Sequence, residues 1–97
     1  MAISTSISDA PPRGQQLEVV ATGELDIATA DHLAEALALA PQVRSVCLDL
    51  SEVTFLDSTA LRVVIDASRR VRLRVVGASG HVRELFRLTG SEALLSV

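Results

Sequence analysis

Three apolar segments in this chain are each followed by a segment with helical spacing, and this alternation limits the fold more than any other feature. The predicted strands cover residues 17–22, 46–50 and 73–76. The helices that follow them are expected over about residues 29–40, 57–70 and 79–90. Strands that alternate with helices of this length indicate an α/β domain whose sheet has a substantial parallel component.

Residues that begin or end regular structure mark the boundaries of these elements. Gly23 is expected to stop the first of these strands, and Pro41 to end the helix that Thr29 caps. Gly77 ends the strand at 73–76, and Ser79 then caps the last helix. No linker, repeat or low-complexity tract interrupts the pattern, so residues 1–97 are expected to form one domain.

The two ends of the chain carry weaker signals. Residues 1–8 predict an edge strand or a tail, and residues 9–14 predict a turn because they hold two prolines and a glycine. Residues 1–15 are thus interpreted as an edge strand and a loop, which form a hairpin with the strand that follows. Residues 94–97 are expected to add a last strand or an apolar tail. The prediction is a mixed β-sheet of four to five strands, packed with three to four α-helices.

The composition restricts both the core and the class of partner. Hydrophobic residues make up 48% of the chain, but only Phe55 and Phe86 are aromatic, so the core must be built from Leu, Val, Ile and Ala. The net charge is −3, and the nine basic residues, all Arg, are scattered along the chain. Such a domain is poorly suited to binding DNA or RNA through phosphates or stacked bases. Direct nucleic-acid binding is therefore not expected.

The sequence also carries no signal for export or membrane insertion. No apolar stretch reaches the roughly 18 residues that span a bilayer, and the first residues do not form a signal peptide. The single cysteine, Cys47, lies in an apolar run and is expected to be a buried thiol in a reducing compartment. These features predict a cytoplasmic protein, expected as a monomer or a weak dimer.

Polar groups concentrate in the segment from Asp49 to Leu61, which leaves a predicted strand and enters a predicted helix. If Asp57 caps this helix, Ser58 occupies the first helical position, near unpaired backbone N–H groups. A phosphate on Ser58 would be stabilised by the helix dipole by about 0.3–1 kcal/mol, while Asp57 opposes it. The fold should survive this modification, while the surface gains about −1.5 to −2 charges.

The same residues have plainer interpretations. Asp57, Ser58 and Thr59 are also what a well-capped helix start requires, and residue types alone do not separate the two readings. A hydrolase nucleophile at Ser58 would need a histidine base and a glycine-flanked turn. Those glycines are missing, and only His32 and His81 could supply the base.

Two further patterns are judged to be structural. Glu24, Asp26, Asp49 and Asp57 could converge beside the sheet edge and bind a divalent ion, but isolated carboxylates more often cap helices or face solvent, so no metal site is assigned. The glycines at residues 77–80 are not followed by the lysine of a phosphate-binding loop, and they predict a turn. No cofactor is expected.

Three stretches of the chain resemble, in the same order, the STAS family (sulfate transporter and anti-sigma antagonist). Gly-Glu-Leu-Asp at residues 23–26 is similar to the family's entry into its first helix. Residues 48–61, with Asp-Ser-Thr at 57–59, resemble its signature strand, loop and phosphoacceptor helix. Residues 76–90 are similar to its closing strand and helix. The likeness covers residues 17–97 and is greatest to the free-standing bacterial anti-sigma factor antagonists.

The resemblance implies a STAS-like domain that works by binding a partner and not by catalysis. In that family, the serine after the motif aspartate is phosphorylated by a partner that is both anti-sigma factor and kinase, and Ser58 holds this position. Unphosphorylated protein would bind the kinase and release a sigma factor, phosphorylation would end the complex, and a phosphatase would reset it. ATP and Mg²⁺ would belong to the kinase.

The resemblance also implies which residues contact the partner. The surface would include a loop at residues 51–56 and the exposed side of the helix that begins at Ser58. The implied contact residues are Gly23, Glu24, Asp26, Asp57, Ser58, Thr59 and Arg62.

One position departs from the family pattern, and two rival functions remain open. The family usually has glycine where this chain has Ala60; alanine favours a helix by about 1 kcal/mol, but its methyl group could obstruct the backbone of a kinase. The first rival is a structural STAS subunit of a larger assembly, such as a stress-sensing complex or a lipid-transport ATPase complex. The second is a nucleotide-binding or hydrolytic enzyme.

Overall fold

A computed structural model describes residues 2–9, 15–38 and 43–95 of the 97-residue chain. In chain order the elements are β1 (Ala2–Asp9), β2 (Gln15–Leu25), α1 (Ala30–Leu37), β3 (Ser45–Leu56), α2 (Ser58–Ser68), β4 (Arg72–Val76), α3 (Gly80–Leu88) and the 3₁₀ turn η2 (Glu92–Leu94). Each of the three predicted strand and helix pairs is present, which confirms the predicted α/β class. None of the helices described has both the length and the apolar character needed to cross a bilayer.

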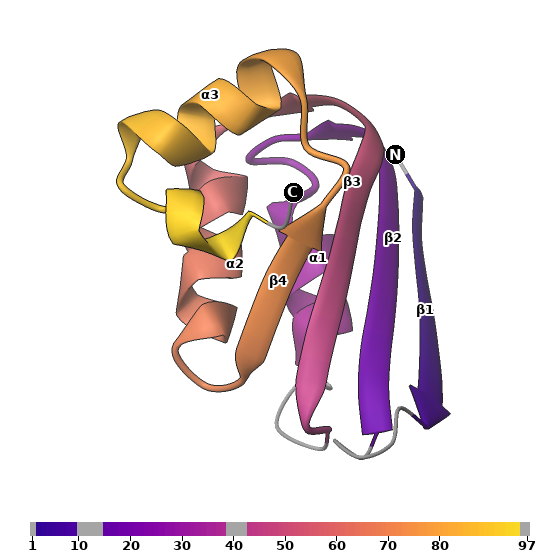
Figure 1. The fold of residues 1–97 in the computed structure, drawn as a ribbon. Helices are drawn as coiled ribbons and strands as arrows, with labels where there is room; N and C mark the ends of the chain where they lie inside the picture. Colours follow the sequence, from indigo (N-terminus) through magenta and orange to yellow (C-terminus); the bar gives the residue numbers. More distant parts are fainter. Residues whose placement is uncertain (1, 10–14, 39–42, 96–97) are drawn as a thin grey trace.

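The four strands form one mixed sheet in the order β1-β2-β3-β4 (Figure 1). β1 is antiparallel to β2, whereas β3 is parallel to both β2 and β4. Helices α1 and α2 cover one face of the sheet, and α3 lies beyond the carboxyl ends of β3 and β4 (Figure 1). The opposite face of the sheet carries none of the described helices.

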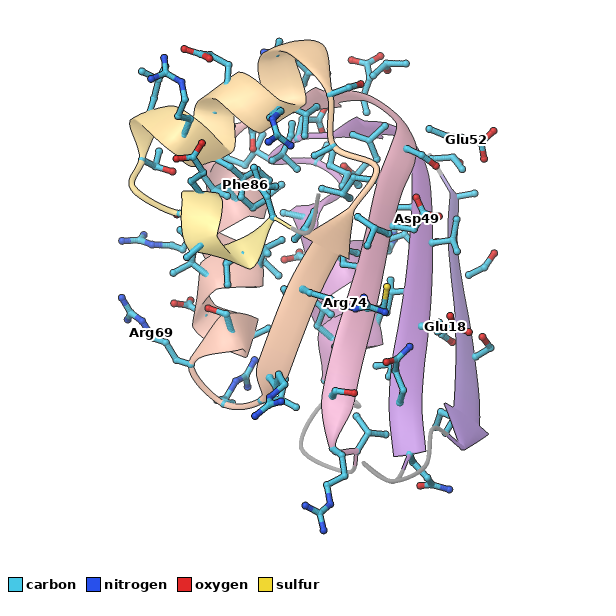
Figure 2. All side chains as sticks on the ribbon, viewed as in Figure 1. Glu18, Asp49, Glu52, Arg69, Arg74 and Phe86 are labelled. Atoms are coloured by element: carbon cyan, nitrogen blue, oxygen red, sulfur yellow. The ribbon has the colours of Figure 1, made fainter. Side chains whose placement is uncertain are left out.

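The hydrophobic core lies between the sheet and the helices. Every second residue is buried from Leu17 to Ala21 on β2 and from Val46 to Leu50 on β3. The helices bury residues at helical spacing, namely Leu33, Leu37, Leu61, Val64 and Val82. Each buried Val or Leu side chain contributes roughly 1.5–3 kcal/mol to folding. The predicted aliphatic core also contains one aromatic ring, that of Phe86, which is labelled in Figure 2 and is fully buried.

The prediction that Gly23 stops a strand is wrong, because Gly23 lies inside β2. Its φ of 83° is in the left-handed region that glycine enters without steric cost. The register between β2 and β3 shifts twice here, between Val20 and Thr22 and between Gly23 and Glu24. Glycine at a bulge therefore allows β2 to continue to Leu25.

The predicted loop at residues 51–56 is instead the second half of β3. From the pair Val20 and Asp49 to the pair Leu25 and Leu56, β2 advances five residues (20 to 25) while β3 advances seven (49 to 56). The extra residues bulge outward, so residues 51–55 are exposed or half-buried, although Leu56 after them is buried. The bulges remove the regular alternation by which a strand is recognised in a sequence.

The turn before α1 differs from the predicted threonine cap. Thr29 precedes the helix but makes no capping bond with its side chain. Instead the Asp26 carboxylate accepts hydrogen bonds from the backbone N–H groups of Ala28 (3.0 Å) and Thr29 (3.2 Å), and Thr29 Oγ1 accepts one from the Asp26 N–H (2.9 Å). Helix α1 ends at Leu37, and the predicted stop at Pro41 lies outside the described residues.

The ends of the chain follow the predictions in part. β1 is the predicted edge strand and pairs with β2 as a hairpin through Asp9, while residues 10–14 of the predicted turn lie outside the described residues. The predicted last strand is replaced by η2 and a single bridge between Val75 and Leu95, and residues 96–97 lie outside the described residues. Ser79 precedes α3 without a capping bond from its side chain.

Cys47 is only half-buried, on the face of the sheet that carries no described helix, and not fully buried as predicted. Burial raises the pKa of its thiol, and the positive charge of Arg74 opposes part of this rise. A thiol whose pKa is raised is a poor nucleophile, so Cys47 lacks the electrostatic setting of a catalytic cysteine.

Candidate functional site

The carboxyl ends of β2 and β3 meet at one edge of the sheet and bring two of the predicted motifs together. The backbone N–H of Asp57 donates a hydrogen bond of 3.0 Å to the carbonyl oxygen of Leu25. Gly23, Glu24 and Asp26 therefore lie beside the start of α2. The structure thus joins residues that are more than thirty positions apart in the sequence.

Asp57 is the amino-terminal cap of α2, as predicted. Its backbone is extended, with φ −99° and ψ 177°, and its Oδ1 accepts a hydrogen bond of 3.0 Å from the Ala60 N–H. This bond satisfies one of the unpaired N–H groups at the start of the helix, an arrangement that contributes about 0.5–2 kcal/mol. Ser58 is the first residue of the helix. Both Ser58 and Thr59 are exposed.

Ser58 and Arg62 line the same groove. The groove has a volume of about 330 Å³ and runs along the exposed side of α2; Asp66, Arg69 and Thr89 also line it. Residues four apart lie on one face of a helix, so Arg62 sits one turn beyond Ser58 on that face. A partner side chain in this groove meets two hydroxyl groups, of Ser58 and Thr89, two guanidinium groups and the carboxylate of Asp66.

The remaining predicted contact residues differ in how far their side chains are exposed to solvent. Glu24 is exposed, and Gly23 is half-buried on β2 opposite the bulged part of β3. Asp26 is half-buried, and its carboxylate is committed to the turn before α1. Asp26 therefore shapes the site through the turn, while Glu24 offers a side chain to solvent.

Ala60 faces the core and not the surface. Its exposed fraction is 0%, and it belongs to the main hydrophobic cluster. Its methyl group therefore points away from any protein that approaches Ser58, which removes the obstruction expected from the sequence. The departure from glycine at this position strengthens the helix without altering the surface.

We expect Ala60→Gly to lower the free energy of unfolding by about 1–2 kcal/mol, because it removes a buried methyl group and a good helix former. Urea denaturation followed by circular dichroism measures this loss. If a kinase phosphorylates Ser58, as the family resemblance implies, its rate should be the same for both proteins. A clearly faster phosphorylation of the glycine variant would show that the methyl group does reach the kinase.

Two exposed apolar residues lie at this end of the sheet; Phe55 belongs to the segment 51–56 expected to contact the partner, whereas Ile27 was not identified from the sequence. Ile27, in the turn after β2, is 75% exposed, and Phe55, near the end of β3, is 39% exposed. The Phe55 ring stacks on His81 with 5.2 Å between ring centroids, and His81 Nε2 accepts a hydrogen bond of 3.5 Å from the Leu56 N–H. Exposed apolar side chains next to a polar site are typical of protein-binding surfaces. The sequence signal for Ile27 was an apolar residue directly after Gly-Glu-Leu-Asp, between a predicted strand and a predicted helix.

The acidic residues do not form a metal site. In the part of the chain that the structure describes, no three His, Cys, Asp or Glu side chains are placed to hold a metal ion together. Asp26 and Asp57 each accept backbone N–H groups at a helix start, and Asp49 accepts one from Ser51 at 2.8 Å. These carboxylates stabilise turns and a helix end.

The chain is similar to known anti-sigma factor antagonists. Two proteins named anti-sigma-B factor antagonist, from Listeria monocytogenes and Staphylococcus aureus, are each 31% identical to it. The first alignment covers 84% of this chain and 77% of the relative, and the second covers 82% and 81%. A crystal structure of an anti-sigma factor antagonist from Mycobacterium paratuberculosis matches with a TM-score of 0.78 at 26% identity, covering 97% of this chain and 83% of that one.

More distant comparisons agree on the fold and the family. The structure of the antagonist SpoIIAA in its unphosphorylated form matches with a TM-score of 0.74 at 18% identity, covering 96% of this chain and 86% of that one, which supports the fold alone. A family model described as "Mlab, STAS domain" matches residues 9–96. Because this match extends over nearly the whole sequence and agrees with the fold, the chain belongs to the STAS domain family.

Proposed function

We propose that this protein is an anti-sigma factor antagonist that is switched by phosphorylation of Ser58. In its unphosphorylated form it binds an anti-sigma factor that is also a serine kinase, and a sigma factor is released for transcription. The kinase then phosphorylates Ser58 and the complex separates, until a phosphatase restores the hydroxyl group. The protein acts in the cytoplasm and is a regulator and not an enzyme.

The observation that carries this proposal is the position of Ser58. It is exposed at the first position of a helix that Asp57 caps, so a kinase can reach the hydroxyl group without unfolding the domain. A phosphate there lies at the positive end of the α2 dipole, worth about 0.3–1 kcal/mol. The modification therefore changes the surface while the core stays intact.

The surroundings of Ser58 suit a protein partner. Ile27 and Phe55 supply exposed apolar area at the same end of the sheet, and the groove along α2 supplies two guanidinium groups against the one carboxylate of Asp66. Aromatic and Arg side chains are the residues that most often dominate binding energy at interfaces. Adding about −1.5 to −2 charges and a bulky group at the centre of this surface disrupts a partner fitted to the hydroxyl group.

The structure gives no support for a hydrolytic function, because His81, which lies against the end of β3, has other contacts. His81 stacks on Phe55 and accepts a hydrogen bond from the Leu56 backbone. A histidine acting as base would instead be oriented toward the Ser58 hydroxyl group. Ser58 therefore suits a substrate for another enzyme better than a nucleophile.

The proposal is tested by mapping phosphate on protein isolated from its own host in growing and in stressed cells. Cleavage after arginine releases residues 45–62, and fragment ions must separate Ser58 from the other hydroxyl residues of that peptide, namely Ser45, Ser51, Thr54 and Thr59. We expect phosphate on Ser58 whose occupancy changes with condition. No phosphate in any condition, with full coverage of the peptide, would favour a structural subunit of a larger assembly.

A further inference from the structure

The face of the sheet opposite α1 and α2 is a second surface, distinct from the Ser58 site (Figure 1). We call it the open face and define it by the side chains of three strands that alternate with the buried positions. These residues are Gln16, Glu18 and Val20 of β2, Ser45, Cys47 and Asp49 of β3, and Arg72, Arg74 and Val76 of β4. Figure 2 shows Glu18, Asp49 and Arg74 on this face.

The strand register arranges these nine residues in three rows that cross the sheet. One row is Glu18, Cys47 and Arg74; the second is Val20, Asp49 and Val76; the third is Gln16, Ser45 and Arg72. In each row the β3 residue lies in the middle, and the β2 and β4 residues lie on either side of it. Neighbouring strands are about 4.8 Å apart, so the outer members of a row are separated by about 10 Å.

The acidic and basic side chains of the open face lie on different strands, and no salt bridge between them is recorded among the described residues. The acidic side chains lie on β2 and β3, and the basic side chains lie on β4. The salt bridge recorded among the described residues, between Arg87 and Glu84, lies elsewhere on α3. Glu18 and Arg74 are both exposed, with the half-buried Cys47 between them. The acidic and basic side chains of this row can therefore pair with a partner that presents a basic group over Glu18 and an acidic group over Arg74.

A second copy of this chain presents groups in that arrangement. A two-fold axis that runs along β3, above the open face, places β4 of one copy over β2 of the other. Arg74 then faces Glu18 of the second copy, Val76 faces Val20, and Arg72 faces the amide of Gln16. Each of the three rows maps onto itself under this one operation, as an isologous interface requires, and the outer members of every row meet a suitable partner. A two-fold axis across the strands would instead place β4 over β4 and oppose arginine with arginine.

We infer that the protein forms a homodimer through the open face, with Arg74 of each copy paired to Glu18 of the other. Sheets that pack face to face with nearly aligned strands form a known class of interface. Along the axis, Ser45 and Cys47 meet their own copies and are small enough for close approach. Asp49 also meets its own copy, and this like-charge contact makes the dimer weaker than it would otherwise be.

The geometry has a consequence for the Ser58 site. The axis runs along the strands, so the carboxyl ends of β2, β3 and β4 point the same way in both copies. Both Ser58 residues therefore lie at one end of the dimer. α2 packs on the covered face, so Ser58 stays accessible in the dimer (Figure 1). The inference does not depend on the proposed function, because dimer formation requires neither the kinase nor phosphate.

The test uses charge reversal in two variants of the purified protein. Glu18→Arg and Arg74→Glu should each weaken the dimer at least tenfold, measured by sedimentation equilibrium, because each places like charges opposite one another. An equimolar mixture of the two variants should form a heterodimer as strong as the wild-type dimer, detected by native mass spectrometry. The double variant should again form a homodimer. If Glu18 paired with Arg74 of its own chain, mixing the two variants would not restore a dimer.

Two controls separate this interface from a general effect of charge. Arg69→Glu makes the same charge change at an exposed position on the far side of the domain and should leave the dimer unchanged (Figure 2). Asp49→Asn removes the like-charge contact and should tighten the dimer severalfold. Wild-type protein that stays monomeric at millimolar concentration, or variants that remain monomeric when mixed, would overturn the inference. Recovery on mixing cannot arise from misfolded variants.

Discussion

Ser58→Asp should weaken binding of the anti-sigma factor at least about tenfold, whereas Ser58→Ala should leave it within about twofold. The carboxylate of the Asp variant adds a negative charge directly after Asp57, on the proposed partner surface. The Ala variant removes only a hydroxyl group. Because Asp57 holds the helix start in both variants, neither change should alter the fold.

Isothermal titration calorimetry against the cognate kinase measures both affinities. Thr5→Asp is the matched control, because it adds the same charge at an exposed position on β1, away from the Ser58 site. This control should bind as the wild type does. Equal affinities of the Asp and Ala variants would count against the switch, and equal weakening by the control would point to a non-specific charge effect.

Phe86→Ala should lower the free energy of unfolding by about 3–5 kcal/mol, the range found when a buried aromatic ring is truncated. The ring is fully buried beneath α3 and packs with the residues of the main core (Figure 2). A domain of this size has a total stability of roughly 5–15 kcal/mol, so the loss is a large fraction of it. We expect the variant to be partly unfolded at 37 °C.

Leu88→Ala on the same helix is the control for this prediction. Leu88 is 69% exposed, so its truncation should cost less than about 0.5 kcal/mol. Urea denaturation of both variants gives the comparison. Similar losses for Phe86→Ala and Leu88→Ala would show that α3 contributes little to the core and would contradict the packing described for it.

The sequence contained enough information for the order of the elements and for the cap at Asp57. Both depend on local patterns, namely the alternation of apolar residues in strands and an aspartate before a helix. The extent of β2 and β3 was underestimated because Gly23 and residues 51–55 interrupt that alternation. A bulge is an extra residue in one strand relative to its neighbour. The pattern of apolar residues within a single segment therefore does not reveal it.

The candidate site could be predicted in part for a similar reason. The cap at Asp57 was predicted from the helix start, while the roles of Ser58 and Arg62 came from the resemblance to the STAS family. Ile27 was missed because exposure depends on the packing of distant segments, whereas Phe55 lay within the predicted contact segment 51–56. Ala60 was placed on the surface by comparison with glycine, whereas the structure turns its methyl group inward.

The bulged second half of β3 has a consequence for local opening. Residues 45–49 of β3 pair with both β2 and β4, but beyond Asp49 the pairing with β4 ends and the register with β2 shifts twice. Amide hydrogens of residues 51–55 should exchange with solvent faster than those of residues 46–49, because opening this end of β3 breaks fewer regular hydrogen bonds. A partner at Ser58 therefore meets a segment that can adjust its shape while the rest of the sheet remains folded.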